Sequence, residues 1–199
     1  MRVLLIGGSS HVGKSTLAQS LATRLGWSHI STDHLARHPG RPWRSDSQTI
    51  PSHVAEHYLS LSVDELIKDV LRHYKGMWPN IESIIVEHAT NCSTNGLIME
   101  GSALWPESVA TLNLDTVAAI WLTASNSLFE TRIFSASQFD NAKGHDKIMI
   151  QKFLERTLRY NKLMMGAINR LGLVSVNVES ISSLDELSNL CLELLKKPT

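Results

Sequence analysis

The residues with the most definite chemistry lie near the start of the chain, where residues 8–15 read Gly-Ser-Ser-His-Val-Gly-Lys-Ser. This G-x-x-x-x-G-K-[ST] pattern is typical of a loop that binds phosphate. Glycine lets the backbone turn so tightly that several N–H groups point at one place, and a helix that begins there favours an anion. The pattern predicts that Lys14 reaches the β- and γ-phosphates of a nucleotide and that the Ser15 hydroxyl ligates Mg²⁺.

The sequence on both sides of this loop favours phosphate binding over a chance match in a Gly- and Ser-rich turn. Residues 2–6 are an apolar run that predicts a buried strand, and leucine and alanine recur at helical spacing between Lys14 and Gly26. A strand, a glycine turn and a helix are the order that the motif requires. We therefore expect the whole loop to contact the nucleotide, through Gly8, Ser9, Ser10, His11, Val12, Gly13, Lys14, Ser15 and Thr16.

Two carboxylates come at the ends of predicted strands. Asp33 follows a short strand over residues 27–31, and Glu100 ends an apolar strand over residues 96–100. Because ligands of parallel sheets bind beyond the carboxyl ends of the strands, we expect Asp33 to orient or deprotonate an attacking hydroxyl. Glu100 would reach Mg²⁺, directly or through water, or activate the acceptor, while Gly101 lets the backbone pass close to a ligand. The alternatives are a helix N-cap at Asp33 and an exposed polar strand end at Glu100.

Arginines occur in two groups that suit negatively charged ligands. The first group follows Asp33 in a single loop and comprises Arg37, Arg41 and Arg44, beside Trp43. Guanidinium groups fit a carboxylate or phosphate on a small substrate, and the alternative is an ordinary solvated loop.

The second group of arginines lies on or near two predicted helices that flank residues 135–144, and comprises Arg132, Arg156 and Arg159. Residues 135–144 are rich in Ser, Gln, Asn and Gly, which is typical of a mobile lid. An arginine on a lid would neutralise charge on a transferred phosphoryl group, whereas ordinary exposed helix arginines would have no such role.

Composition limits the classes of partner. The chain has 199 residues, enough for one domain with a sizeable core. Lys+Arg and Asp+Glu both number 19, and the resulting formal net charge of zero argues against nucleic acid as a partner. Cys92 and Cys191 lack metal or redox spacing, so we expect reduced, buried thiols in a cytoplasmic protein. No apolar run approaches the length of a membrane span, so we expect no membrane partner.

Residues 53–57 read His-Val-Ala-Glu-His and match the H-x-x-E-H pattern of one class of zinc peptidase. The chain has nine histidines, which makes a chance match unsurprising, and no distal glutamate ligand presents itself. We interpret this segment as an ordinary helix face and expect no zinc site there.

Predicted strands alternate with predicted helices, which favours a parallel sheet with helices on both faces. We expect strands over residues 2–6, 27–31, 96–100, 116–122 and 173–178. We expect two helices within residues 52–74, the second with a capping box at Ser62 and Glu65. A third helix is expected from about residue 79 to 90, with Pro79 in its first turn, and further helices from residue 127, over 146–171 and over 183–197.

The phosphate loop, Ser-Thr-Asp at residues 31–33 and Leu-Ile-Met-Glu-Gly at residues 97–101 together resemble the P-loop small-molecule kinases. This set includes nucleoside, nucleotide, shikimate and gluconate kinases, chloramphenicol phosphotransferase and zeta-type toxins. The Glu-Gly strand end resembles that of 2-phosphoglycerate-kinase-like and nicotinamide-riboside-kinase-like proteins. Two features depart from the common pattern: the third strand ends in Glu100 where Asp is commoner, and no dense run of arginines follows Arg132.

The resemblance implies an α/β fold, the P-loop NTPase three-layer sandwich, with a five-stranded parallel sheet of order 2-3-1-4-5. It implies one kinase domain over residues 1–199, a helical acceptor-binding insert over about residues 34–92 and a lid over about residues 132–160. ATP and Mg²⁺ would be bound, and the loop of residues 177–180, including Asn177, would border the adenine.

The sequence as a whole predicts an ATP-dependent phosphotransferase that acts on a hydroxyl of a small polar or anionic molecule. The expected catalytic residues are Lys14, Asp33, Glu100 and Arg132, and the expected acceptor site comprises Asp33, Arg37, Arg41, Arg44, Glu100 and Gly101. The alternatives are a regulatory nucleotide-binding ATPase or switch protein without a small-molecule acceptor, and a kinase-fold toxin or modifier of RNA ends. The sequence leaves open both a monomer and a homodimer, and both ATP and GTP as the donor.

Overall fold

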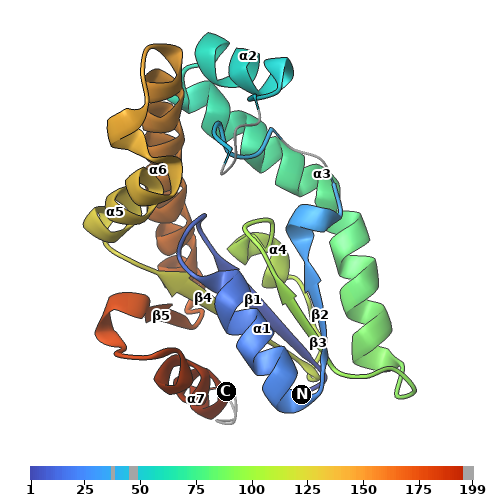
Figure 1. Cartoon of the computed structure of the whole chain (residues 1–199). Helices are drawn as coiled ribbons and strands as arrows, with labels where there is room; N and C mark the ends of the chain where they lie inside the picture. Colours follow the sequence, from blue (N-terminus) through green and yellow to red (C-terminus); the bar gives the residue numbers. More distant parts are fainter. Residues whose placement is uncertain (37–38, 45–48, 195–199) are drawn as a thin grey trace.

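Five parallel strands form one hydrogen-bonded sheet in the order β2-β3-β1-β4-β5 (Figure 1). The computed structural model describes residues 1–36, 39–44 and 49–194. The order 2-3-1-4-5 implied by the resemblance is confirmed. The strands are β1 (Val3–Gly8), β2 (Ser28–Ser31), β3 (Leu97–Glu100), β4 (Val117–Thr123) and β5 (Ser175–Asn177).

Helices cover both faces of the sheet and complete a three-layer arrangement (Figure 1). Alternate side chains of β1 point to opposite faces, so that Leu4 and Ile6 enter one core and Val3 and Leu5 enter the other. The first core includes side chains of α1 (Lys14–Leu25), α2 (Ser52–Ser60), α5 (Asn126–Ser137) and α7 (Leu184–Leu194). The second includes side chains of α3 (Val63–Thr90), α4 (Pro106–Val109) and the second half of α6 (His145–Leu171).

The central strand β1 positions the functional edge of the sheet. All six of its residues are buried, and it pairs with β3 on one side and β4 on the other. Ile6 is in register with Glu100. The end of β3 therefore lies beside the point where β1 runs into the phosphate loop.

Two helix ends follow the local rules that the sequence suggested. Gly26 ends α1 in the left-handed conformation, with a φ of +66°. At the start of α3, the Ser62 N–H donates to Glu65 Oε2 at 2.8 Å and the Glu65 N–H donates to Ser62 Oγ at 3.3 Å. The predicted capping box is confirmed.

The prediction of a separate helix that begins at Pro79 is wrong. Helix α3 runs without interruption over Val63–Thr90, with Pro79 in its interior. Proline removes one backbone hydrogen bond there, but a buried stripe at i, i+4 spacing continues through it, made by Met77, Ile81, Ile85 and Ala89. Packing of this stripe against the sheet outweighs the local preference of proline for a helix start.

Other elements differ from the expectations in smaller ways. The short helix α4 and the 3-10 turns η1 (Thr32–His34), η2 (Phe139–Asn141) and η3 (Val178–Ser180) were not predicted. Cys191 is buried as expected, but Cys92 is exposed, because it lies in the turn between α3 and β3. Across the residues that the structure describes, no helix combines the length and apolarity needed to cross a membrane.

Replacing the proline within α3 should stabilise the protein. Pro79→Ala restores a helical N–H and should raise the free energy of unfolding by about 1–2 kcal/mol, less than the full helix-interior penalty of proline because the unfolded chain also gains freedom. Urea denaturation measures the change, with Asn80→Ala at the next exposed position as the control. A destabilised Pro79→Ala variant would instead indicate that a bend at Pro79 seats α3 on the sheet.

Candidate functional site

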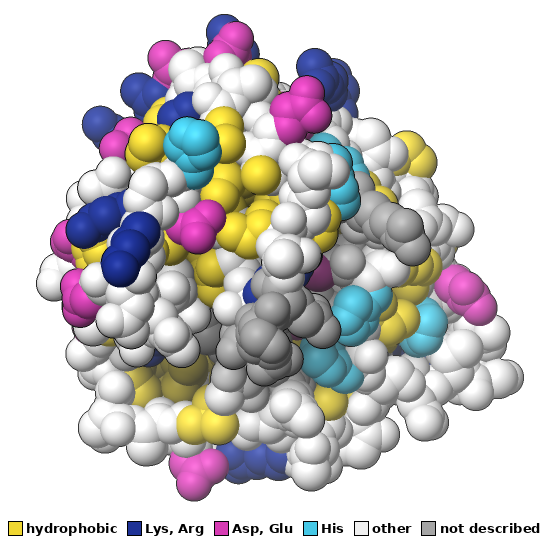
Figure 2. Space-filling view, turned by 45° about the horizontal axis from the view of Figure 1, so that its top comes forward, with side chains coloured by type: hydrophobic (Ala, Val, Ile, Leu, Met, Phe, Trp, Pro, Cys, Tyr) yellow, Lys and Arg dark blue, Asp and Glu magenta, His cyan; other side chains and the backbone are white. Residues whose placement is uncertain are grey.

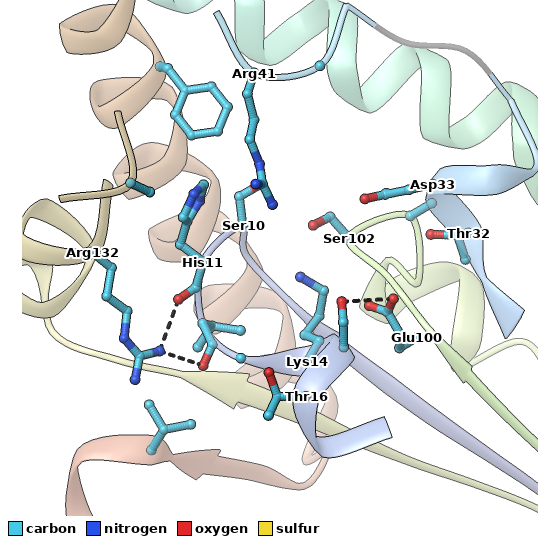
Figure 3. A pocket seen from close by; sticks show the side chains of 18 of the residues that line it. Ser10, His11, Lys14, Thr16, Thr32, Asp33, Arg41, Glu100, Ser102 and Arg132 are labelled. Carbon is cyan, nitrogen blue, oxygen red and sulfur yellow. Dashed lines mark hydrogen bonds between the residues drawn. The ribbon is translucent and has the colours of Figure 1, made fainter. Parts of the chain in front are cut away.

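A cleft of about 1180 Å³ opens at the carboxyl edge of the sheet. Its walls come from the phosphate loop, the ends of β2 and β3, segment 40–44, helices α3, α5 and α6, and the chain that follows β5. Figure 3 shows Lys14, Arg41 and Asp33 pointing into this cleft from three different segments. Parallel sheets bind ligands at this edge, so the cleft is the candidate functional site.

The phosphate loop has the backbone curl that its glycines permit. Gly8 and Gly13 have φ values of +145° and +107°, and His11 adopts a φ of +64° between them. Lys14 begins α1 and folds back so that its ammonium donates to the Ser9 carbonyl at 2.8 Å. Burial lowers the pKa of Lys14, while the carboxylates of Glu100 and Asp33 act in the opposite direction and stabilise its charged form.

Glu100 meets the phosphate loop directly. The Ser15 hydroxyl donates to Glu100 Oε1 at 3.0 Å, and Glu100 is 3% exposed, so it is not the exposed strand end of the alternative interpretation. Hydroxyl and carboxylate oxygens are ligands that Mg²⁺ prefers. The described ranges contain no group of three or more His, Cys, Asp or Glu side chains that could hold a metal. A cation at Ser15 and Glu100 would need further oxygen ligands besides these two side chains.

Asp33 lies in η1 at the end of β2, where it is exposed and lines the cleft. The neighbouring Thr32 is fully buried against Gly101, which has a φ of +155°. A Cβ atom at position 101 would lie only 1.7 Å from Thr32 Oγ1. Gly101 thus lets the ends of β2 and β3 approach each other, which brings Asp33 and Glu100 to the same cleft.

Arg132 contacts the phosphate loop from α5. Its Nη1 donates to the carbonyls of His11 and Val12, at 3.0 Å each (Figure 3). These bonds satisfy two carbonyls of the loop and fix their orientation.

The other arginines separate into three environments. Arg41 and Arg44 are exposed and line the cleft, whereas Arg37 lies outside the described residues. Arg156 also lines the cleft but is only 7% exposed. Arg159 pairs with Asp64 of α3 at the surface, far enough from the cleft that it is not one of its lining residues.

Arg156 combines burial with an incomplete set of partners. Its guanidinium lies 4.8 Å from the ring centroid of Phe153 and 5.5 Å from that of Tyr58. Its Nη1 atom is buried and has no hydrogen-bond partner among the residues that the structure describes. Cation–π contact offsets part of the cost of burying a guanidinium, and an anion in the cleft would offset more.

The sequence did not predict the ring packing between His11 and Trp43. The His11 ring lies 5.6 Å from the Trp43 ring and 5.7 Å from the Phe153 ring, between centroids. Burial, and after it the nearby cations Arg41, Lys14 and Arg132, together lower the pKa of His11 to about 4. These contacts join residues far apart in the chain, so no local pattern could have revealed them.

The residues after β5 form the remaining wall. Asn177 is exposed, and its side chain accepts a hydrogen bond from the Glu179 N–H at 3.0 Å, which caps η3. Asn177 is not one of the lining residues of the cleft, whereas the apolar side chains of Val178, Ile181 and Leu184 are. An apolar wall beside a phosphate loop suits the flat face of a nucleotide base.

Charges of both signs are spread over the surface. On the face that Figure 2 shows, Lys and Arg side chains are interspersed with Asp and Glu. This mixture agrees with the zero formal net charge of the chain.

Comparisons with known proteins agree on the fold. No family model matches the chain. A curated relative, 2-phosphoglycerate kinase from Methanocaldococcus jannaschii, is 27% identical over 206 residues, which cover 98% of this chain and 64% of that protein. The chain therefore spans about two thirds of the length of the curated relative that it matches.

Two solved structures are similar along nearly the whole chain. A gluconokinase from Sinorhizobium meliloti has a TM-score of 0.55 at 18% identity, covering 97% of this chain and 90% of that one. A shikimate kinase from Aquifex aeolicus has a TM-score of 0.56 at 12% identity, covering 98% and 96%. The chain has the P-loop fold of these small-molecule kinases, as the sequence resemblance implied.

A methyl group at position 101 should destabilise the protein. Gly101→Ala places a Cβ against Thr32 Oγ1 and should lower the free energy of unfolding by about 1–3 kcal/mol in urea denaturation. The control is Gly166→Ala within α6, where a Cβ would meet nothing within 4 Å. This variant should raise the free energy of unfolding by at most about 1 kcal/mol. Equal stability of Gly101→Ala and wild type would contradict the tight approach of β2 to β3.

The protein should lose stability as the pH falls from 6.5 to about 4, in part because of His11. Its pKa is lowered from 6.5 to about 4 on folding, so the unfolded chain takes up a proton in this range before the folded protein does. Stability due to a neutral His11 is therefore present above pH 6.5 and lost toward pH 4.

The variant His11→Asn removes this titration. Between pH 7 and pH 4, the unfolding free energy of wild type should fall by on the order of 2 kcal/mol more than that of His11→Asn. His29→Asn, at an exposed position of β2, controls for the loss of a histidine. Parallel pH profiles for wild type and His11→Asn would rule out a buried neutral imidazole.

Proposed function

We propose that this protein is an ATP-dependent kinase that transfers the γ-phosphoryl group to a hydroxyl of a small anionic molecule. The observation that carries the proposal is the grouping of Lys14, Ser15, Glu100 and Asp33 at one edge of the sheet, in one cleft. A phosphate loop that faces two carboxylates has the parts needed to hold a nucleotide, a cation and an attacking hydroxyl. We further propose a cytoplasmic location, which the free cysteines Cys92 and Cys191 support.

The nucleotide would lie along the phosphate loop. The N–H groups of residues 8–16 and the Lys14 ammonium would bind its phosphates. Val178, Ile181 and Leu184 offer the base an apolar wall at the far end of the cleft. Arg132 would keep the loop in shape through its bonds to the His11 and Val12 carbonyls.

Magnesium fits the oxygen ligands that meet beneath the loop. Ser15 Oγ and Glu100 lie 3.0 Å apart and would hold the ion, Ser15 directly and Glu100 directly or through water. When bound, Mg²⁺ neutralises charge on the β- and γ-phosphate oxygens.

Asp33 would act on the acceptor. Its carboxylate would accept the proton of the acceptor hydroxyl as that oxygen forms a bond to the γ-phosphorus. The bond from the γ-phosphorus to the oxygen that bridges it to the β-phosphate breaks, and ADP leaves with the electron pair. Lys14 and the loop N–H groups would stabilise the negative charge throughout the transfer.

Several cations favour an anionic acceptor. Arg41 and Arg44 line the cleft, and the unsatisfied Nη1 of buried Arg156 needs an acceptor oxygen. The similar proteins are kinases that are named for gluconate, shikimate and 2-phosphoglycerate. All three are carboxylic acids that also bear hydroxyl groups, so we infer a hydroxy acid as the acceptor for this chain as well.

The two segments assigned from the sequence resemblance fit this picture. Within about residues 34–92, Arg41, His73, Tyr74 and Met77 line the cleft, which supports an acceptor-binding insert. Within about residues 132–160, Arg132, Ala136, Phe153 and Arg156 line it, which supports a lid. Arg37 remains a predicted acceptor ligand.

Phosphate transfer from γ-labelled ATP into a panel of hydroxy acids and phosphorylated hydroxy acids tests the proposal. Lys14→Ala should lower transfer by about 100- to 1000-fold. Asp33→Asn should lower kcat by about 100- to 10,000-fold, because the proton acceptor is lost, and leave the affinity for MgATP near that of wild type, because Glu100 and the Ser9 carbonyl still stabilise Lys14. Lys162→Ala and Asp140→Asn, at exposed positions outside the cleft, are the matched controls.

Two results would count against a kinase. ATP hydrolysis that no acceptor stimulates would favour the regulatory ATPase or switch protein, and binding of labelled oligonucleotides that weakens with salt would favour an RNA-end modifier. Parallel reactions with γ-labelled GTP decide the donor.

A further inference from the structure

His11 has a left-handed backbone conformation, which is unfavourable for a residue with a Cβ atom. Its φ is +64°, and within the described part of the chain Gln138 is the other non-glycine residue with a positive φ. Glycine and asparagine adopt the left-handed region more readily than histidine does. A histidine at this place therefore calls for a compensating interaction of its ring.

The ring of His11 packs against two other rings. Its centroid lies 5.6 Å from that of Trp43 and 5.7 Å from that of Phe153, and the Trp43 and Phe153 centroids are 4.8 Å apart. Trp43 is 8% exposed and Phe153 is 1% exposed. Neither ring nitrogen of His11 has a hydrogen-bond partner among the described residues. Ring packing is thus the contact that the structure provides for this side chain, and we call His11, Trp43 and Phe153 the aromatic cluster.

The aromatic cluster joins the phosphate loop to segment 39–44. This segment carries Arg41 and Arg44, both of which line the cleft. The Tyr58 hydroxyl of α2 donates to the Gly40 carbonyl at 2.9 Å and holds the start of the segment. Trp43 holds its other end, against the loop and α6. A displacement of segment 39–44 would therefore change the ring contacts of His11.

The backbone of His11 has a second support. Arg132 Nη1 donates to the carbonyls of His11 and Val12, at 3.0 Å each. The turn at His11 thus depends on α5 through its carbonyl and on segment 39–44 through its ring. Displacement of Trp43 would remove one of these two supports from the loop.

We propose that the contact of His11 with Trp43 couples the two halves of the cleft, so that a seated segment 39–44 raises the affinity of the phosphate loop for a nucleotide. The proposal rests on the proposed function, because it takes residues 8–16 as a nucleotide site. His11 and Trp43 are positioning residues that act through the shape of the loop. An anion that fixes Arg41 and Arg44 would therefore tighten nucleotide binding, and the coupling is reciprocal.

Calorimetric titration of the full chain with MgADP tests this coupling without knowledge of the acceptor. Trp43→Ala should weaken MgADP binding by about 3- to 10-fold, the effect of losing one or two aromatic contacts, and Trp43→Phe should restore most of the affinity. His11→Asn tolerates the left-handed backbone but lacks the packed ring, so it should weaken binding similarly. In the double variant Trp43→Ala/His11→Asn, the loss should be no greater than the larger single loss.

Trp78→Ala, a tryptophan of α3 outside the cleft, is the matched control and should bind MgADP as wild type does. Urea denaturation identifies a variant that fails to fold, in which case Trp43→Phe and His11→Asn carry the comparison. Wild-type affinity in Trp43→Ala, or additive losses in the double variant, would overturn the coupling alone. Failure of wild type to bind MgADP would overturn the nucleotide site and the coupling with it.

Discussion

The buried ammonium of Lys14 is the constraint on which the site depends. A cation taken out of water needs compensation, and here it comes from the Ser9 carbonyl at 2.8 Å and from the carboxylates of Glu100 and Asp33. Those carboxylates lie at the ends of two strands that are far apart in the sequence. They reach Lys14 because the strand order β2-β3-β1 sets their ends next to the phosphate loop. Fold topology and local charge balance are therefore parts of one arrangement.

The cleft is polarised although the chain is neutral. Arg132 and Arg41 line the walls made by α5 and segment 39–44, while Asp33 and Glu100 line the wall at the ends of β2 and β3 (Figure 3). Arg156 adds a further cation from α6. The formal net charge of zero conceals this separation because it sums over all charged residues of the chain. A ligand in the cleft would meet cations on one wall and carboxylates on another.

Local signals allowed most of the elements to be predicted from the sequence, and tertiary packing accounts for the rest. The phosphate loop, the capping box at Ser62 and the stop at Gly26 depend on neighbouring residues, and the structure has all of these features. The strand order came from the resemblance to a known fold. The predicted helix start at Pro79 was wrong because the packing of the buried stripe of α3 outweighs the local preference of proline for a helix start.

The candidate site shows the same division. Asp33 and Glu100 could be proposed because Glu100 ends a strand and Asp33 follows one, but the difference between buried Arg156 and surface Arg159 depends on which face of α6 meets the cleft. The ring contacts of His11 join three distant segments. Arg132 adds a further consequence, because its two bonds to the loop carbonyls come from α5, within the protein itself. Bonds of this kind order part of the loop on folding, so that part of the entropic cost does not fall on the capture of an anion.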